Sequence, residues 1–366
     1  LSCKEKKPIV RFVDGGDTTG GTTPLPPNTI DAKSISIDML NVQQDITMVG
    51  GDMERSAASL MNAANPDDVA KWSFFDIKFD VCRLSFDKKQ ELIEGTTNFA
   101  FYDSPIIAMK KIKALNPNII FWATCKTDYS GYGDENNLPD WVYTGAGYNG
   151  GSYDPSKLNT TKYARFLADY LKLMSDNGVA VGYISVMKEW IQVVTVDKEY
   201  ETITKLKALL ATSTYSGVPV PQFIGPAAWG VTQATSFVNS VKTKNYQDQY
   251  FGFASHSYNA SNYTNWQNLA NAAKSVGKNI WHGESNNFGG GPTNGVEPGT
   301  QNLINGYVTK KMMYDAGLNG EVFFELWSRC LNNETRSIYF TKNGQASRLR
   351  GYYMMKDFAN NIKSKK

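Results

Sequence analysis

The stretch VAVGYISVMKEW, residues 179–190, decides the fold because a buried strand ends there in two charges. Val179 to Met187 form an almost continuous apolar run, which is typical of a parallel strand buried on both faces. Lys188 and Glu189 follow directly, and a charged pair is costly in that place unless it is solvated, paired or used chemically. The stretch therefore predicts a parallel sheet with functional residues at its carboxyl edge.

Seven further segments have the same strand-like character, and helical patterns with apolar residues three and four apart alternate with them. With the first stretch included, the predicted strands are Ile46–Gly51, Phe79–Ser85, Ile119–Thr124, Val181–Met187, Pro221–Pro226, Tyr250–His256, Lys278–Glu284 and Gly320–Trp327. Such a succession of βα units predicts a (β/α)8 TIM barrel, an α/β fold, as one domain over residues 31–366.

A doubly wound sheet is the structural alternative, and it would favour a nucleotide-binding enzyme. Its first strand is usually followed by a glycine-rich turn that holds phosphate at a helix N-terminus. Here that turn reads GGDMERSAAS, residues 50–59, with Asp52 and Glu54 where the phosphate would lie. These negative charges disfavour nucleotide and so favour the barrel.

Composition excludes several other classes of protein. The net charge of +3 is too small to indicate a nucleic-acid partner. There are only two histidines, without HExxH or CxxC, so we predict no metal and no cofactor. A G-x-S-x-G nucleophile elbow is also absent. Cys82, Cys125 and Cys330 follow apolar runs and are predicted to be buried free thiols.

The N-terminal sequence LSCKEKK resembles the end of a bacterial lipoprotein signal, with Cys3 as the lipidated residue. The following Gly/Thr/Pro-rich sequence completes a predicted flexible tether over residues 1–30. We therefore expect a monomer anchored by lipid to a bacterial outer membrane, facing outside, with no spanning helix. The alternative is an arbitrary start of the chain.

Polar side chains gather at the carboxyl ends of the predicted strands, which all open on one face of a barrel. They are Arg83, Glu189, His256, Tyr258, Glu284 and the aromatic Trp327. Two carboxylates on one barrel mouth are the minimal set for glycoside hydrolysis, provided that one stays protonated and the other ionised. A cation such as Arg83 beside Glu284 would keep the second carboxylate ionised.

These residues carry a resemblance to a known group of enzymes. Glutamates that end the fourth and seventh strands, SHSY at 255–258 and CRLSF at 82–86 resemble the clan-A retaining glycoside hydrolases. MVGGDMERSAASLM at 48–61 and RLRGYYMMKDFANNI at 348–362 resemble most the glucosylceramidase, endo-xylanase and β-1,6-glucanase family within that clan. A fainter likeness is to β-agarases and β-porphyranases.

The resemblance implies a role for each matching residue. Glu189 in SVMKEW matches the general acid/base, and Glu284 in IWHGES matches the nucleophile. Arg83 and Tyr258 match the residues that hydrogen-bond the nucleophile, and Trp327 matches the aromatic floor under the sugar. The implied enzyme is a retaining glycosidase.

The sequence departs from the family pattern in two respects. The family carries a side β-sandwich, whereas this sequence stops just after the last barrel helix. The clan has Asn before the acid/base, where this chain has Lys188. We expect the Lys188 ammonium to bind an anionic sugar, and the alternative is an ion pair with Asp52 or Glu54.

Further substrate contacts are predicted in and near the long loops. Trp141 lies within the connection 125–160 and is a candidate sugar platform. Asn286 follows the seventh strand, and His256 is expected to orient its neighbours. Trp122, Trp190 and Trp229 are assigned to the core or the rim.

The sequence as a whole predicts an endo-acting retaining glycosidase of polysaccharides or oligosaccharides. A non-catalytic carbohydrate-binding lipoprotein built on a hydrolase barrel is the alternative from another functional class.

Overall fold

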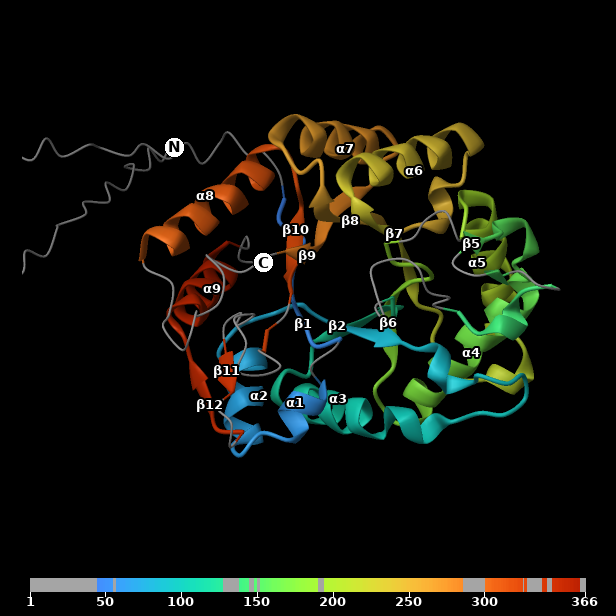
Figure 1. Ribbon diagram of the computed structural model, residues 1–366, viewed down its shortest axis with the longest axis horizontal. Coiled ribbons are helices and arrows are strands. Elements are labelled where there is room, and N and C mark those ends of the chain that lie inside the picture. The colour runs from blue at the N-terminus through green and yellow to red at the C-terminus, as the bar shows by residue number, and fades with distance from the viewer. Residues whose placement is uncertain are drawn as a thin grey trace, which may run out of the picture. The chain divides into compact units, whose positions relative to one another are not determined.

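Eight parallel strands close into a barrel in the computed structural model (Figure 1). The structure describes residues 45–54, 57–127, 138–144, 148–149, 152–189, 194–285, 300–324, 326–327, 338–340 and 344–362. Around the barrel the order is β1-β10-β9-β8-β7-β6-β3-β2. Their bounds are β1 Met48–Asp52, β2 Val81–Phe86, β3 Ile120–Cys125, β6 Val181–Ser185, β7 Gln222–Gly230, β8 Gly252–Asn259, β9 Asn279–Ser285 and β10 Gly320–Phe323. The predicted TIM barrel is confirmed.

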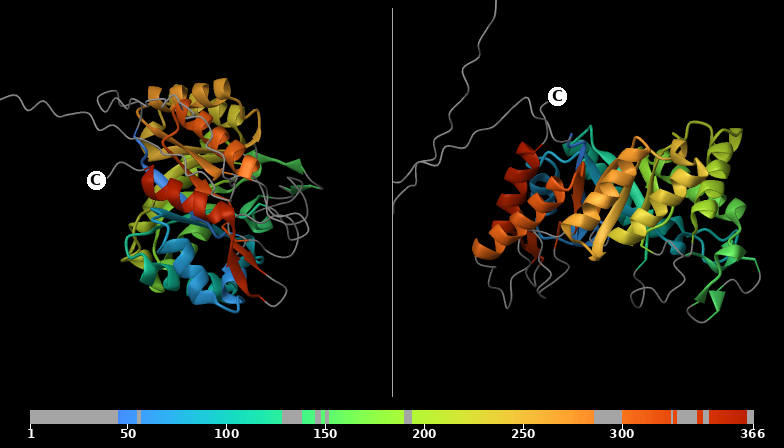
Figure 2. Two further views of the ribbon diagram at one scale, coloured as in Figure 1. Left: turned by 90° about the vertical axis from the view of Figure 1, so that its left-hand side faces the viewer. Right: turned by 90° about the horizontal axis from the view of Figure 1, so that it is seen from above.

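Helices surround the barrel and connect its strands (Figures 1 and 2). They are α1 Ala57–Met61, α2 Pro66–Phe74, α3 Asp103–Leu115, α4 Thr160–Asp176, α5 Val196–Leu210, α6 Val231–Lys244, α7 Tyr263–Ser275, α8 Thr300–Asp315 and α9 Arg350–Asn361. Side chains accept hydrogen bonds from the first backbone N–H groups of several of them, as Asn159 does for α4 and Thr195 for α5. The apolar face of each helix completes the core between helices and strands.

Two small antiparallel sheets lie outside the barrel among the described residues: β4 Tyr148–Asn149 with β5 Ser152–Tyr153, and β11 Ile338–Phe340 with β12 Ala346–Arg348.

Large side chains fill the inside of the barrel. A separate apolar cluster takes at least one residue from each strand except β6, against which it packs through Tyr183. Trp281 of β9 is the largest of these side chains together with Trp122 of β3, and both are fully buried. The interior is therefore a packed core, and a functional site is expected at an end of the barrel.

A glycine makes room for Trp281. A Cβ at Gly252 of β8 would lie 2.2 Å from Cζ3 of the Trp281 ring. The Trp281 indole nitrogen donates to Thr47 Oγ1 over 3.0 Å, which fixes the ring in place.

The predicted eighth strand is too long. β10 ends at Phe323 rather than Trp327, because the chain turns so that Leu326 and Trp327 enter the core between β1 and α2. β7 and β8 run four and three residues past their predicted ends, and the other five strands end within two residues of theirs. Of the predicted free thiols, Cys82 and Cys125 are confirmed as free and buried.

Part of the prediction lies outside the described residues. The tether over residues 1–30 with Cys3, and also Cys330 and Asn286, belong to this part, so lipidation and location in the cell envelope stay predictions. Among the described residues, no helix has both the length and the apolar character needed to cross a membrane.

The packing of Trp281 can be tested by substitution. Gly252→Ala should lower the free energy of unfolding by about 1–3 kcal/mol, because the new methyl group overlaps the indole ring. Urea denaturation measures this loss. Adding Trp281→Phe, which shortens the overlapping ring, should cost less in the Gly252→Ala protein than in the wild type; equal costs in both would contradict the account.

Candidate active site

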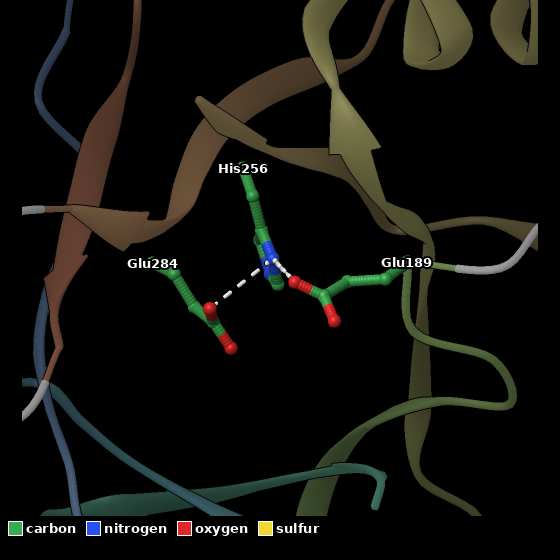
Figure 3. A group of neighbouring side chains, drawn as sticks. All are labelled: Glu189, His256 and Glu284. Carbon is green, nitrogen blue, oxygen red and sulfur yellow. Dashed lines mark hydrogen bonds and ion pairs between the residues drawn. The ribbon is translucent and has the colours of Figure 1, made fainter. Parts of the chain in front are cut away.

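The carboxyl ends of the barrel strands bring Glu189 and Glu284 together (Figure 3). Glu284 lies near the end of β9, and Glu189 follows β6 by four residues. The His256 imidazole of β8 lies between them: its Nδ1 is 2.9 Å from Glu189 Oε1 and 3.3 Å from Glu284 Oε2. One nitrogen of His256 and one carboxylate oxygen from each glutamate all lie within 4.8 Å of one another. The two glutamates predicted to be catalytic therefore share one site.

Glu284 is surrounded by hydrogen-bond donors and positive charge. Arg83 Nη2 of β2 donates to its Oε1 over 2.5 Å, and the Tyr258 hydroxyl donates to Oε2 over 2.7 Å. Burial by itself would raise the pKa of Glu284, but the Arg83 charge, with His256 and Lys188, holds that pKa well below its ordinary value. Glu284 is thus ionised, as a nucleophile must be.

Arg83 joins three acidic side chains. Its Nε donates to Asp52 Oδ2 over 2.5 Å, and its Nη2 lies 3.2 Å from Glu54 Oε2. The side chains of Arg83, Asp52 and Glu54 are all fully buried. Asp52 and Glu54 therefore belong to the site. In the sequence they were interpreted only as charges that disfavour phosphate and as possible partners of Lys188.

Lys188 forms an ion pair inside the protein, which corrects the expectation of an anionic sugar. Its Nζ donates to both carboxylate oxygens of Glu54, over 2.7 and 2.8 Å, and lies 3.5 Å from Glu284 Oε1. The residue is 3% exposed. The alternative reading, a pair with Glu54, is the one that the structure shows, because Glu54 points from the β1–α1 turn into the same buried space.

Glu189 has different surroundings from Glu284. The Thr127 hydroxyl donates to its Oε2 over 3.1 Å, and His256 contacts Oε1. Its φ of 62° is left-handed, a conformation that non-glycine residues adopt at a cost and that is common at functional sites. Its N–H donates to the carbonyl of Ala227 in β7 over 2.8 Å, which holds this backbone in place. Thr127 was missed from the sequence, although it lies just after a predicted strand end.

Two predicted sugar contacts are corrected. Trp327 is fully buried, and its indole nitrogen donates to Ser73 Oγ of α2 over 2.7 Å, so it belongs to the core and forms no floor under a sugar. Trp141 donates to the carbonyl of Glu91 over 2.7 Å, and Arg165 covers its ring at 4.6 Å. Trp141 therefore fastens its connection to α4 and is no sugar platform.

A different aromatic pair lies beside the carboxylates. The half-buried Trp229 at the end of β7 stacks on Tyr258, with ring centroids 6.3 Å apart and planes 26° apart. Tyr258 is 43% exposed although its hydroxyl reaches Glu284. This pair, which we call the rim pair, offers aromatic surface at the barrel mouth. The signal in the sequence was that Trp229 and Tyr258 stand three and two residues after the ends of consecutive predicted strands, Pro221–Pro226 and Tyr250–His256.

His256, Glu189 and Glu284 also have the residue types and spacing of a metal site. Tyr258 donates to Glu284 Oε2 and Thr127 donates to Glu189 Oε2, and Arg83 and Lys188 add two positive charges next to Glu284. We therefore assign no metal to this group.

Comparison with known proteins gives similar structures at low sequence identity. No family model matches the sequence, and no curated protein matches it. SrfJ from Salmonella typhimurium has a TM-score of 0.67 at 16% identity over 87% of this chain and 76% of SrfJ. The catalytic domain of GH30 xylanase C from Talaromyces cellulolyticus has a TM-score of 0.60 at 12% identity, over 86% and 76% of the two chains. An endo-β1,6-glucanase has a TM-score of 0.58 at 15% identity over the same shares. The predicted resemblance is thus confirmed at the level of the barrel fold.

The low pKa of Glu284 makes a prediction about stability against pH. Because the folded-state pKa lies below the unfolded value, this stabilisation is present above about pH 4.3 and is lost as pH falls toward the folded pKa. Below that pH, the free energy of unfolding should fall more steeply in the wild type than in Glu284→Gln, by up to about 1.4 kcal/mol per pH unit. Urea titrations from pH 6 to pH 3 measure it. Glu201→Gln, at a half-exposed position, should run parallel to the wild type; a parallel Glu284→Gln profile would contradict the assignment.

Proposed function

We propose that this protein is a retaining glycoside hydrolase of polysaccharides or oligosaccharides. One observation carries the proposal: two buried carboxylates meet at the barrel mouth in opposite surroundings. Glu284 lies against the cations Arg83 and Lys188, whereas Glu189 is bonded to a neutral hydroxyl and to the imidazole of His256. Surroundings that differ in this way assign one carboxylate to attack and the other to proton transfer.

The reaction proceeds in two steps. Glu284 attacks the anomeric carbon, and the bond to the leaving oxygen breaks as Glu189 gives that oxygen a proton. Glu189 then takes a proton from the water that attacks the glycosyl ester, and Glu284 leaves again as a carboxylate. Arg83 and Tyr258 hold Glu284 in the orientation for attack.

The spacing of the carboxylates supports retention. Their facing oxygens lie within 4.8 Å of each other. Carboxyl groups about 5–5.5 Å apart are typical of retaining enzymes, whereas inverting enzymes leave about 6.5–9.5 Å for a water.

Charge at the site supports a neutral sugar at the point of cleavage. Among the described side chains, the cations Arg83 and Lys188 are engaged with the carboxylates of Asp52, Glu54 and Glu284. An anionic substituent would have to compete with these carboxylates for the two cations. The printed names of the similar structures make xylan and β-1,6-glucan the first substrates to test.

The rim pair supports action within a chain. Aromatic faces next to the carboxylates stack on sugar rings, so Trp229 and Tyr258 extend the binding surface beyond the cleaved bond. We therefore propose endo action.

The two glutamates should be separable by azide rescue. Glu284→Ala should abolish turnover of dinitrophenyl β-glycosides, and azide should yield a glycosyl azide of inverted configuration, because azide enters the space of the missing nucleophile. Glu189→Ala should lose roughly 10²–10⁴-fold on polysaccharide and, with azide, give the retained product. Product NMR identifies both.

Glu201→Ala, at the same half-exposed control position, should keep wild-type rates. The opposite pairing of azide products would mean that the roles are exchanged. Binding of polysaccharide in affinity gels without release of reducing ends would favour the non-catalytic carbohydrate-binding protein instead.

The rim pair should matter only for longer substrates. Trp229→Ala should lower kcat/KM on polysaccharide about 2- to 12-fold, since one stacked aromatic contact is worth about 0.5–1.5 kcal/mol, and should change hydrolysis of aryl monosaccharides little. Tyr353→Ala removes an exposed aromatic ring from α9 and should leave both rates unchanged. Equal losses on short and long substrates would argue against the stacking role.

A further inference from the structure

The reaction proposed above gives no role to Lys188, although its ammonium lies beside Glu284. We propose that Lys188, held by Glu54, is a positioning residue that clamps the nucleophile Glu284 through Oε1, the carboxylate oxygen next to Arg83, whereas His256 lies next to Oε2. The proposal rests on the proposed function, because it assigns Glu284 to attack. We call Lys188 and Glu54 the clamp.

The donors of Lys188 are taken up by carboxylates. Two are directed to the oxygens of Glu54 at 2.7 and 2.8 Å, and Glu284 Oε1 lies next at 3.5 Å. Arg83 reaches the same oxygen of Glu284 at 2.5 Å and also lies 3.2 Å from Glu54. Arg83, Glu54, Lys188 and Glu284 thus form a closed ring of alternating charge.

The ring is buried, so the attractions between its charges are strong. The side chains of Arg83 and Glu54 are 0% exposed, and those of Lys188 and Glu284 are 4% and 3% exposed. Interactions between charges are screened much less inside a protein than at its surface. Without Lys188, Arg83 would be the cation left in the ring, in contact with the carboxylates of Asp52, Glu54 and Glu284.

The clamp also joins the two catalytic groups. Lys188 and Glu189 are consecutive, and the left-handed turn at Glu189 is bonded to β7 through its N–H. Lys188 reaches the nucleophile while Glu189 reaches His256. One backbone turn therefore sets the place of the acid/base and, through Lys188, of the nucleophile, and displacement of about 1 Å at such a site can cost 10²-fold in rate.

The effect of Lys188 on Glu284 has to be separated from that of other charges. Among the described residues, the titratable and charged groups around Glu284 include Asp52 on β1, Glu54 after it, Arg83 on β2, Lys188 and Glu189 after β6, His256 and Tyr258 on β8, and His282 on β9; Lys126, after β3, acts on Glu54. Lys188 and Glu54 have opposite signs, so their removal should have opposite direct effects on Glu284.

The test is a titration of Glu284 that needs no activity. Protein labelled with ¹³C at the glutamate carboxyl carbons is followed by NMR against pH, and Glu284→Gln assigns the signal. Lys188→Met should raise the pKa of Glu284 by roughly one to three pH units, the effect of losing an adjacent opposite charge. Lys188→Arg should restore most of the wild-type value, and Glu54→Gln should not raise it.

Kinetics supply the second readout. Lys188→Met should lower kcat about 10- to 100-fold with little change in KM, and move the acidic limb of kcat/KM upward in pH. Arg165→Met is the matched control, because it removes a cation from the buried Glu91 near α4 and should leave the Glu284 titration unchanged.

The outcomes separate the clamp from the proposed function. An unchanged Glu284 titration in Lys188→Met would overturn the clamp, even if azide rescue confirms the hydrolase. A raised pKa without any glycosyl azide from Glu284→Ala would keep the electrostatic clamp and reject the hydrolase. If Lys188→Met does not fold, Lys188→Met/Glu54→Gln is compared with Glu54→Gln, and the pKa must again be higher in the protein without Lys188.

Discussion

The structure of the site depends on one buried guanidinium. Arg83 of β2 contacts Asp52 on β1, Glu54 in the following turn and Glu284 on β9. These positions are far apart in the chain, and only the closed barrel places them around one side chain. A buried cation is tolerated because carboxylates surround it, and the carboxylates are tolerated because the cation is there. The barrel must therefore close before Arg83 can keep Glu284 ionised.

The two glutamates owe their difference to the strands beside them. β2 supplies Arg83 to Glu284, and β8 supplies both Tyr258 and His256. Glu189 receives the Thr127 hydroxyl from the connection after β3. His256 contacts both carboxylates, so a change in the charge of one is communicated to the other over two short distances. Because these residues contact one another, the effects of substituting them should not be additive.

Strand ends were predictable from the sequence because apolar runs and parallel topology place them on one face. Glu189, Glu284, Arg83 and Tyr258 meet for that reason alone. Side-chain partners inside loops were harder to predict. Lys188 pairs with Glu54 because the β1–α1 turn directs that carboxylate inward. The exposure of the tryptophans was the least predictable property. Trp327 is bonded to Ser73 and the ring of Trp141 is covered by Arg165, and both partners are remote in sequence. The predicted strand Pro221–Pro226 ends three residues before Trp229, and the stacking of Trp229 on Tyr258 depends on neighbouring strands with shifted register.

The aromatic filling of the barrel has a consequence for proton supply. Trp122 and Trp281, with the apolar residues around them, occupy the interior beneath the carboxylates. In the proposed reaction, the proton that Glu189 gives up returns from the attacking water, and this apolar filling leaves the barrel mouth as the entrance for that water. Sugar and water then use the same entrance. A leaving group that stays bound there would keep out the water that both frees the sugar and recharges Glu189, which couples release of the first product to the second step.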